Sequence, residues 1–423
     1  MTSGISPIQL TLAASLLASA ALFGASPASA EDVTLTVWDW KSGDPLAAPY
    51  FEQAKEAFEA AHPGVTIEYG MQPHDQYYTV LGTAITAKQG PDVVLLHGGA
   101  RTKERADALV KLDDSIADIR DGLAGWGEFV GEDGGAYAIP ISIQGFAIYY
   151  NKDLYEQAGL DPENPPRTWA ELGESCEKIT ASGVACFVLG NKEGYAAEFF
   201  FSSIAANSWT QDEQDAWAAG ELNWTDPPVK KILELWVESN EAGWYPPGAN
   251  STAMFMDEFE AFERGDGANV IGLISDVAHW KEFEDFLGAD KVGVFRPVAL
   301  EAMDGDLKLP VAGGIGYAVT NWSPNKELAI EFAKSLASQE NLAEFFKTAG
   351  AIVPDKGFDV ASVESPGAAT ILGWIGCCSA SMAHNAIGTA ELEDFHRQSQ
   401  LLLNGDTTVD EAAAVLAKYR SAN

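Results

Sequence analysis

The first hundred residues alternate between strand and helix patterns. Apolar and polar side chains alternate over 34–40, which predicts a β-strand, and a second strand is expected over 65–69. Between them, apolar residues recur at the spacing of one helix face, at Phe51, Ala54, Phe58 and Ala61. A second helix is expected over 77–87 and a buried strand over 90–96. This β-α-β-α-β order predicts a mostly parallel sheet with right-handed crossovers, whose ligands bind at the carboxyl ends of the strands.

The run from 135 to 160 is typical of a crossing between two lobes. One strand pattern ends near Pro140, and a second strand pattern follows directly and leads into a helix. We therefore expect the chain to leave a first lobe here and to enter a second one.

The pattern beyond this crossing predicts a second set of helices and strands. Thr168 and Glu171 have the spacing of a capping box, which marks the start of a helix. An aromatic helix is expected over 197–206, and a longer helical region over 225–265 is broken by a Pro-Pro-Gly turn. Further strands are expected over 186–190, 268–274, 292–295 and 309–320. The strands over 292–320 are expected to return towards the first lobe, so the two lobes are interleaved in sequence.

Residues 1–30 have the composition of a secretory signal. They carry no charged side chain, hold an apolar stretch from Ile8 to Phe23 and end in Ala-Ser-Ala. The absence of Lys and Arg before the apolar stretch is unusual for such a signal. No cysteine stands at the expected cleavage point, so we expect a mature chain from Glu31 that is exported without a lipid anchor.

Length and charge restrict the class of protein further. About 390 mature residues exceed what one hydrophobic core usually holds, which favours two lobes. The formal net charge of −36 argues against nucleic acid or an anionic membrane as partner, because both require a positive surface.

Four cysteines are present in a chain expected to be exported, where disulfides are permitted. Cys176 ends a helical stretch and Cys186 begins the next strand, so a local bridge between them is expected. The neighbouring pair Cys377 and Cys378 is not expected to bond to itself easily. The sequence does not choose among the three possible pairings of four cysteines.

Several segments together resemble the family 1 extracellular solute-binding proteins, the sugar-binding components of ABC importers that include the maltose- and trehalose/maltose-binding proteins. The order and spacing of the segments carry the resemblance, which extends over the whole mature chain. They are Gly90–Val93, the crossing at 135–160, Phe262–Ala268, 313–332, 338–340, 350–354 and 404–412.

This resemblance implies an α/β periplasmic-binding-protein fold with two lobes, each a mixed, mostly parallel sheet flanked by helices. It implies three hinge crossings, near 140–144, 310–314 and 372–378. The N-terminal lobe would consist of 31–140 and 315–371, and the C-terminal lobe of 141–310 and 378–423. The implied protein is a periplasmic monomer that closes over a carbohydrate ligand and delivers it to the permease subunits of an ABC importer, without cofactor, metal or catalysis.

Sugar sites combine aromatic platforms for the apolar sugar face with polar groups for the hydroxyl rim. The aromatic candidates are Trp38, Trp40, Tyr195, Trp209, Trp280 and Trp374. The polar candidates are Lys41, Asp44, His97, Gln144, Glu193, Asp276, His384 and Asn385. Gly313 and Gly314 would expose backbone to a close ligand. Ser275-Asp276 stands where the maltose-binding proteins carry an aromatic, which points to a smaller or more polar sugar.

Two alternatives remain open from the sequence. A polyol or polyamine binder of the same fold is one, since Asp44, Glu193 and Asp276 could surround a cation. A secreted glycoside hydrolase is the other, although 62 acidic residues make any pair of carboxylates uninformative. The chain has no GxSxG, P-loop or GxGxxG motif that would indicate another enzyme.

Overall fold

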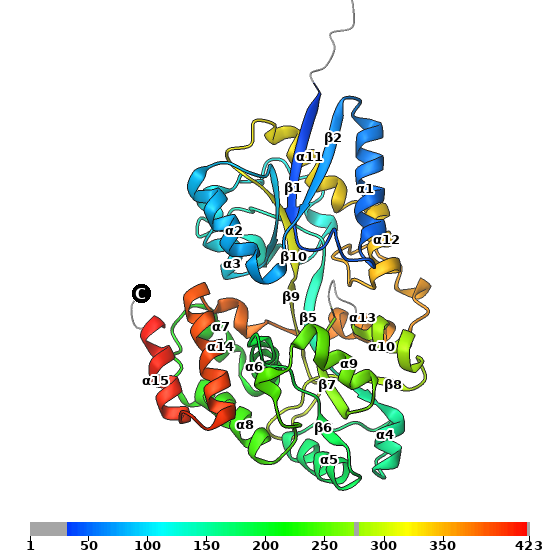
Figure 1. The fold of residues 1–423 in the computed structure, drawn as a ribbon, viewed down its shortest axis with the longest axis vertical. Helices are drawn as coiled ribbons and strands as arrows, with labels where there is room; N and C mark the ends of the chain where they lie inside the picture. The colour runs from blue at the N-terminus through cyan, green and yellow to red at the C-terminus, as the bar shows by residue number, and fades with distance from the viewer. Residues whose placement is uncertain (1–31, 275–278, 421–423) are drawn as a thin grey trace, which may run out of the picture.

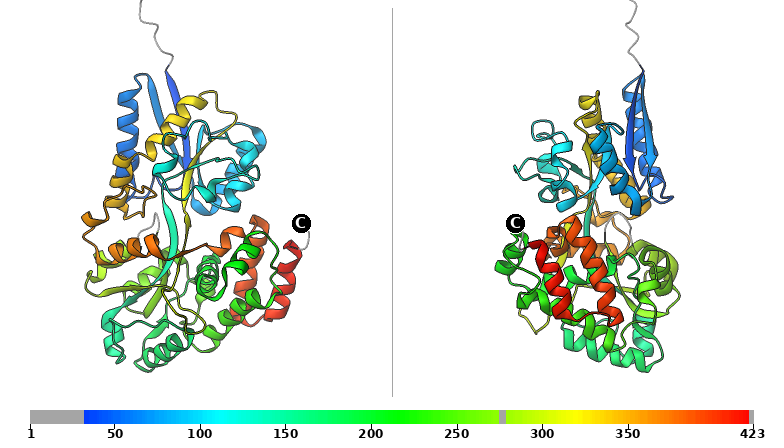
Figure 2. Two further views of the ribbon diagram at one scale, coloured as in Figure 1. Left: turned by 180° about the vertical axis from the view of Figure 1, so that it is seen from behind. Right: turned by 60° about the vertical axis from the view of Figure 1, so that its left-hand side comes forward.

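The computed structural model describes residues 32–274 and 279–420, and these form two α/β lobes (Figure 1). The expected signal segment 1–30 and the candidate Asp276 lie outside the described residues. We call residues 32–140 and 315–358 the first lobe, and residues 143–313 and 363–420 the second lobe. Figure 2 shows that the two lobes lie one above the other and are joined by extended strands.

The first lobe is built on a five-stranded sheet in the order β2-β1-β3-β10-β4. Strand β1 (Val33–Asp39) lies between β2 (Val65–Met71) and β3 (Val93–His97) and runs parallel to both, as the sequence predicts. Strand β10 (Ile315–Val319) runs antiparallel to β3 and to β4 (Ile139–Pro140). The helices of this lobe are α1 (Ala48–Ala61), α2 (His74–Ala87), α3 (Ala100–Lys103), α11 (Lys326–Leu336) and α12 (Gln339–Ala349).

The second lobe is built around β5 (Ile143–Asn151). It runs antiparallel to β7 (Gly267–Leu273), β8 (Val292–Phe295) and β9 (Leu309–Gly313). Parallel pairs lie further out, where β6 (Ala185–Phe187) joins β7 and β11 (Ser379–Ala380) joins β9. This sheet is mixed with β5 antiparallel to its neighbours, because β5 enters the lobe in the direction opposite to the strand β9 that leaves it.

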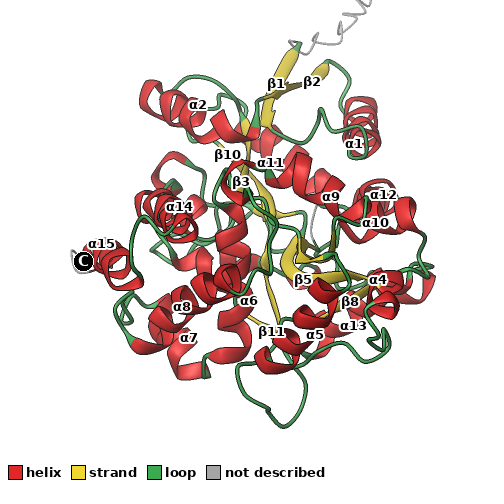
Figure 3. Ribbon diagram, turned by 60° about the horizontal axis from the view of Figure 1, so that its bottom comes forward, coloured by secondary structure: helices red, strands yellow, loops and turns green. Residues whose placement is uncertain are grey.

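Helices surround the strands of the second lobe (Figure 3). They are α4 (Lys152–Gln157), α5 (Trp169–Ala181), α6 (Tyr195–Ser208), α7 (Gln211–Ala218), α8 (Pro227–Glu241), α9 (Phe259–Glu263), α10 (His279–Leu287), α13 (Pro366–Cys377), α14 (Thr389–Asn404) and α15 (Val409–Arg420). The predicted capping box is present at the start of α5, where the Thr168 hydroxyl accepts the Glu171 N–H and the Glu171 carboxylate accepts the Thr168 N–H.

Two passages of the chain join the first sheet to the second. The chain leaves the first sheet at Pro140 and enters the second at Ile143, and it returns between Gly313 and Ile315. The two passages run side by side, since Ile143 pairs with Gly313 in the β5–β9 ladder.

The third passage lies earlier in the chain than expected. Residues 372–378 do not cross between the lobes, because they end α13, whose Ala368 and Ile371 are buried in the core of the second lobe. The passage occurs between Phe358, which packs on the core of the first lobe, and Val363, which packs on that of the second. An apolar helix face fixes the lobe to which α13 belongs, and the local pattern of 366–377 does not reveal which lobe covers that face.

Two disulfides are present in the structure. Cys176 and Cys186 are joined across the turn from α5 to β6, as expected, with their sulfurs 2.01 Å apart and both residues buried. Cys377 and Cys378 are bonded to each other at the end of α13, contrary to the expectation that neighbouring cysteines would not pair. Over residues 32–274 and 279–420, no helix is long and apolar enough to span a bilayer.

Candidate functional site

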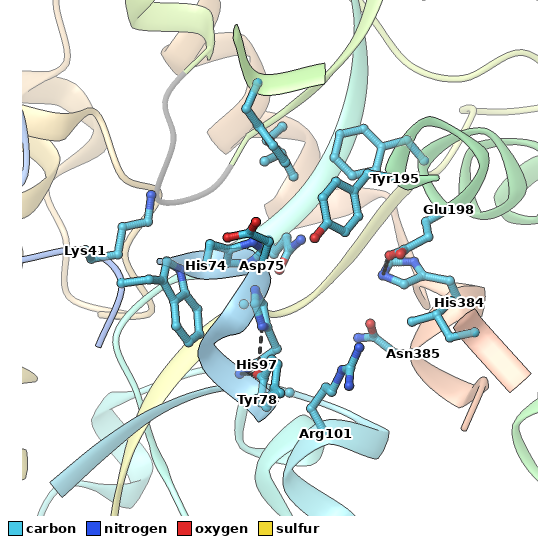
Figure 4. Close-up of a pocket in the computed structure, with 18 of the residues that line it drawn as sticks. Lys41, His74, Asp75, Tyr78, His97, Arg101, Tyr195, Glu198, His384 and Asn385 are labelled. Carbon is cyan, nitrogen blue, oxygen red and sulfur yellow. Dashed lines mark hydrogen bonds and ion pairs between the residues drawn. The ribbon is translucent and has the colours of Figure 1, made fainter. Parts of the chain in front are cut away.

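A cavity of about 580 Å³ lies between the two lobes. The first lobe lines it with the loop after β1, the start of α2 and the residues after β3, which are the carboxyl ends of strands that the sequence indicated. The second lobe lines it with α6, the 3₁₀ turn Ala383–Ala386 and the start of α14, and the passage at Gly313 and Gly314 forms part of the wall. Figure 4 shows side chains from both lobes pointing into this common space.

The loop after β1 is held by a buried carboxylate. Asp39, the last residue of β1, accepts hydrogen bonds from the backbone N–H groups of Lys41 (2.7 Å) and Ser42 (2.6 Å). These bonds turn the chain so that Trp40, Lys41 and Asp44 face the cavity. The Lys41 Nζ lies 3.9 Å from an Asp44 carboxylate oxygen, so one charge of each sign stands at this edge.

An aromatic stack forms the first-lobe wall. The Trp40 and His97 rings are stacked, with centroids 4.6 Å apart and an interplanar angle of 18°. The Tyr78 hydroxyl accepts the backbone N–H of His97 (2.9 Å) and lies 2.8 Å from Nδ1 of the same residue, so two contacts fix the position of the His97 ring. Burial raises the pKa of Tyr78, so its hydroxyl stays protonated.

Arg101 brings a cation to the same wall. Its guanidinium lies 4.6 Å from the Tyr78 ring centroid, and that of Arg105 lies 4.7 Å from the same centroid. Nη1 of Arg101 donates a hydrogen bond to the Thr389 hydroxyl of the second lobe at 3.3 Å. In Figure 4 the Arg101 guanidinium points towards Asn385 and the cavity.

The second-lobe wall contains a buried carboxylate between two histidines. Glu198 lies against His396 Nε2, and its other oxygen is 3.4 Å from His384 Nε2. Burial by itself would raise the pKa of Glu198, but the charge of His396, the hydrogen bond to His396 and the charge of Arg101 outweigh it and lower the pKa to about 2. Glu198 is therefore ionised throughout the physiological range.

His384 is fixed in the same way as His97. The Ser202 hydroxyl accepts the His384 backbone N–H (3.1 Å) and lies 2.8 Å from His384 Nδ1. Burial lowers the pKa of His384, which favours the neutral ring. Beside it, Tyr195 at the start of α6 points its hydroxyl into the cavity (Figure 4), and burial raises the pKa of that hydroxyl, so it stays protonated and able to donate.

Ten of the residues singled out from the sequence line the cavity. They come from both lobes and from the passages between them: Trp40, Lys41, Asp44, His97, Gln144, Tyr195, Gly313, Gly314, His384 and Asn385.

Five others lie elsewhere. Trp38 packs inside the first lobe, where its ring covers Gly70, and Trp209 is buried against Phe201 and Trp217 with its N–H donated to a backbone carbonyl. Trp280, Trp374 and Glu193 each contact a different protein group.

Trp280 bridges the two lobes without lining the cavity. It is 5% exposed, stacks on Phe346 of α12 and donates its N–H to the Gly350 carbonyl of the first lobe at 3.0 Å. Trp374 of α13 lies beside Arg296, and the Glu193 carboxylate accepts the backbone N–H of Met254. In each case the observed partner is a protein group outside the cavity.

Sequence reasoning missed several lining residues. His74, Asp75 and Tyr78 lie on the first turns of α2, and their i, i+1 and i+4 spacing gave no apolar signal. Arg101 follows β3 within a stretch that the sequence did indicate as a strand end. Glu198 could have been found, because it is the one charged residue of the apolar helix α6 (Tyr195–Ser208).

The cavity offers aromatic faces, fixed donors and carboxylate acceptors, the groups that bind a polyhydroxylated ligand. Among the described residues, no cluster of His, Cys, Asp or Glu has the arrangement of a metal site. The donors are the Arg101 guanidinium, the Tyr195 hydroxyl and side-chain amides, and the acceptors include the Asp44 and Asp75 carboxylates that line the same space.

Comparison with known proteins bears on the family and the fold. The sequence profile of the bacterial extracellular solute-binding proteins matches residues 43–343. A protein of Brucella abortus (strain 2308), named as a binding protein, is 30% identical over 242 residues, which are 54% of this chain and 55% of that protein. The sn-glycerol-3-phosphate-binding periplasmic protein UgpB of Escherichia coli (strain K12) is 27% identical over 210 residues, 48% of this chain and 45% of UgpB. The chain thus matches about half the length of these curated relatives.

A solved structure agrees in fold over almost the whole described chain. A chitin oligosaccharide binding protein superposes with a TM-score of 0.83 at 21% sequence identity, covering 92% of this chain and 98% of that protein. The profile match extends over most of the sequence and both lobes, so the chain belongs to the bacterial extracellular solute-binding protein family.

Proposed function

We propose that this chain is an exported, periplasmic solute-binding protein that captures a mono- or oligosaccharide between its lobes and delivers it to the permease subunits of an ABC importer. The observation that carries the proposal is the cavity of about 580 Å³ lined by aromatic and polar side chains of both lobes. A ligand that contacts both lobes binds the closed form better than the open form and so shifts the population towards closure. A monomer suffices for this mechanism.

The chemistry of the walls favours a carbohydrate. Trp40 and Tyr195 come from opposite lobes and place aromatic surface on two sides of the cavity. The Arg101 guanidinium and the Tyr195 hydroxyl line the cavity as hydrogen-bond donors, which suits hydroxyl oxygens, and the similarity to a chitin oligosaccharide binding protein agrees with a sugar ligand. A polyol or polyamine is the alternative within the same fold, and the similarity to UgpB adds sn-glycerol 3-phosphate as a compound to test. We propose no catalysis.

Thermal unfolding of the mature chain against a compound panel tests the proposal. The panel holds monosaccharides, maltodextrins, chito-oligosaccharides, polyols, polyamines and sn-glycerol 3-phosphate. A ligand that binds only the native state raises the melting temperature with concentration. A shift from a carbohydrate supports the proposal. A shift only from a polyamine or from glycerol 3-phosphate would overturn the carbohydrate assignment, and hydrolysis of a chromogenic glycoside would overturn the assignment as a binding protein.

The site is tested by removing one aromatic ring from each lobe. Trp40→Ala and Tyr195→Ala should each weaken binding of the carbohydrate found in the panel by about 1–3 kcal/mol, as loss of an aromatic platform does elsewhere, which is roughly tenfold to hundredfold in Kd. Trp38→Ala is the matched control from the same stretch of the first lobe, and it should lower stability more than affinity. Unchanged calorimetric affinity in both cavity variants would contradict the site.

A further inference from the structure

On the side of the cleft formed by α3, the two lobes meet through polar groups. We call this contact the seam: residues 99–104 and Glu128 of the first lobe against residues 385–389 of the second. The Asn385 amide donates to the Glu128 carboxylate at 2.9 Å. Gly99, with a φ of 68°, approaches so closely that a Cβ there would lie 2.7 Å from the Asn385 carbonyl oxygen.

Helix α14 begins at the seam, and its N-cap residue offers no side-chain acceptor to the first N–H groups of the helix. The helix begins at Thr389, and its N-cap residue is Gly388, which has no side chain. The Glu391 carboxylate accepts the Gly388 N–H at 3.3 Å, and this leaves the Thr389 N–H to be satisfied from outside the helix.

The missing acceptor comes from the other lobe. The Glu104 carboxylate, at the end of α3, accepts the Thr389 N–H at 2.9 Å and the Thr389 hydroxyl at 2.5 Å. A carboxylate at a helix N-terminus is also favoured by the helix dipole. The Thr389 N–H at the start of α14 therefore has the Glu104 carboxylate as its acceptor only while the two lobes are in contact.

The same threonine connects this contact to the cavity. Its hydroxyl donates to Glu104 and accepts a hydrogen bond from Arg101 Nη1 at 3.3 Å. Arg101 lines the cavity, whereas Glu104 is not among the lining residues. When the lobes separate, α14 loses its cap and Arg101 loses this partner together.

We propose that Glu104 and Thr389 form an interlobe latch, in which the Glu104 carboxylate caps α14 across the cleft, favours the closed arrangement and positions Arg101 towards the ligand. Glu104 is a positioning residue, since it acts on the ligand through Thr389 and Arg101. The latch rests on the proposed function in one respect, namely that the two lobes move relative to one another.

The first test measures the distance across the seam without any ligand. Fluorophores are attached through non-natural amino acids at Lys103 and Arg397, both exposed, which leaves the two disulfides intact. Glu104→Ala should lengthen and broaden the single-molecule energy-transfer distance distribution of the wild-type chain, and Thr389→Val should do the same. Identical distributions in the wild-type chain and both variants would overturn the proposal.

The matched control removes a cap inside one lobe. Glu171 caps α5 by accepting the Thr168 N–H, and both residues belong to the second lobe. Glu171→Ala should lower the melting temperature and leave the distance across the seam unchanged. If Glu104→Ala acted only through a general loss of structure, Glu104→Ala and Glu171→Ala would change the distance across the seam to the same extent.

The second test uses the carbohydrate that gives the largest thermal shift. Glu104→Ala should raise its Kd about threefold to tenfold, in line with the loss of a helix cap, and Glu171→Ala should leave the Kd unchanged. If no carbohydrate binds, the proposed function is wrong. The distances measured without ligand still test the latch in that case. An unchanged Kd in the Glu104 variant would contradict its coupling to the ligand.

Discussion

The two lobes meet on two flanks that are built from different chemistry. At the seam, Asn385 and Thr389 contact the first lobe through side-chain hydrogen bonds to Glu128 and Glu104. On the opposite side, which we call the hinge flank, α10 packs against α12 and Gly350, with the buried Trp280 ring stacked on Phe346.

This difference indicates which flank opens. Separating the seam exposes polar groups that water can hydrogen-bond, so its net cost is small. Separating the hinge flank would expose a buried indole and would disturb the paired passages at Ile143 and Gly313, at a much larger cost. Polar contacts on one side and apolar packing on the other make a cleft that opens at the seam and bends at the hinge flank.

The largest effect is expected from breaking the hinge flank. Trp280→Ala should lower the free energy of unfolding by about 3–5 kcal/mol, because it leaves a cavity between the lobes and an unpaired Gly350 carbonyl. Urea titration measures this loss. Trp209→Ala serves as control, because it removes an indole that is also 5% exposed but lies inside the second lobe. Only the Trp280 variant should change the distance between labels on α10 and α12. Unaltered stability with lost sugar binding would instead make Trp280 a ligand platform.

A smaller effect is expected from the carboxylate beneath the seam. Glu198 holds His384, the neighbour of Asn385, and its pKa of about 2 lies below the ordinary value of 4.5. A lowered pKa contributes stability above pH 4.5 that is lost as the pH falls towards 2. Glu198→Gln should therefore cost roughly 2–3 kcal/mol at pH 7, and the difference from the wild-type chain should shrink below pH 4.5.

The pH series has a control with the opposite sign. Burial raises the pKa of Glu258, so the contribution of this carboxyl group to the free energy of unfolding falls as the pH rises. The stability of Glu258→Gln relative to the wild-type chain should therefore increase with pH. Urea midpoints between pH 3 and pH 8 decide between the trends. A Glu198 difference that is independent of pH would contradict the ionised carboxylate between two histidines.

The smallest change in stability is expected from a single methyl group at the seam. Gly99 and Gly134 both have positive φ, 68° and 72°, which an L side chain rarely adopts, so alanine at either position should cost about 1–2 kcal/mol in backbone strain. A Cβ at Gly134 meets nothing within 4 Å, whereas one at Gly99 meets the second lobe. Gly99→Ala alone should therefore widen the seam and weaken carbohydrate binding. Equal affinity in the two variants would contradict a close seam.

Much of the fold follows from local patterns in the sequence. The alternation over 34–40 and the helix spacing that follows it predict β1 and α1, and the capping box at Thr168 predicts the start of α5. The third passage could not be placed in this way, because the apolar face of α13 shows that the helix is covered and does not show by which lobe.

The candidate site shows the same division. Residues at strand ends, such as Trp40 and His97, were found because a parallel sheet directs its carboxyl ends to one edge. Trp280 was misplaced because an indole at a lobe boundary has the same local sequence signal whether it faces a ligand or the other lobe. Glu104 was missed since its partner, Thr389, lies 285 residues away in sequence.

The most direct test of the account is a pair of distances measured in the same wild-type chain during titration with the carbohydrate found by thermal shift. One label pair spans the seam, at Lys103 and Arg397, and the other spans the hinge flank, at Asp285 and Lys347, all exposed positions. The ligand should shorten and narrow the distribution of the seam distance and leave the hinge-flank distance unchanged. Saturating ligand with neither distance altered, or with both altered equally, would contradict closure of the cleft at the seam.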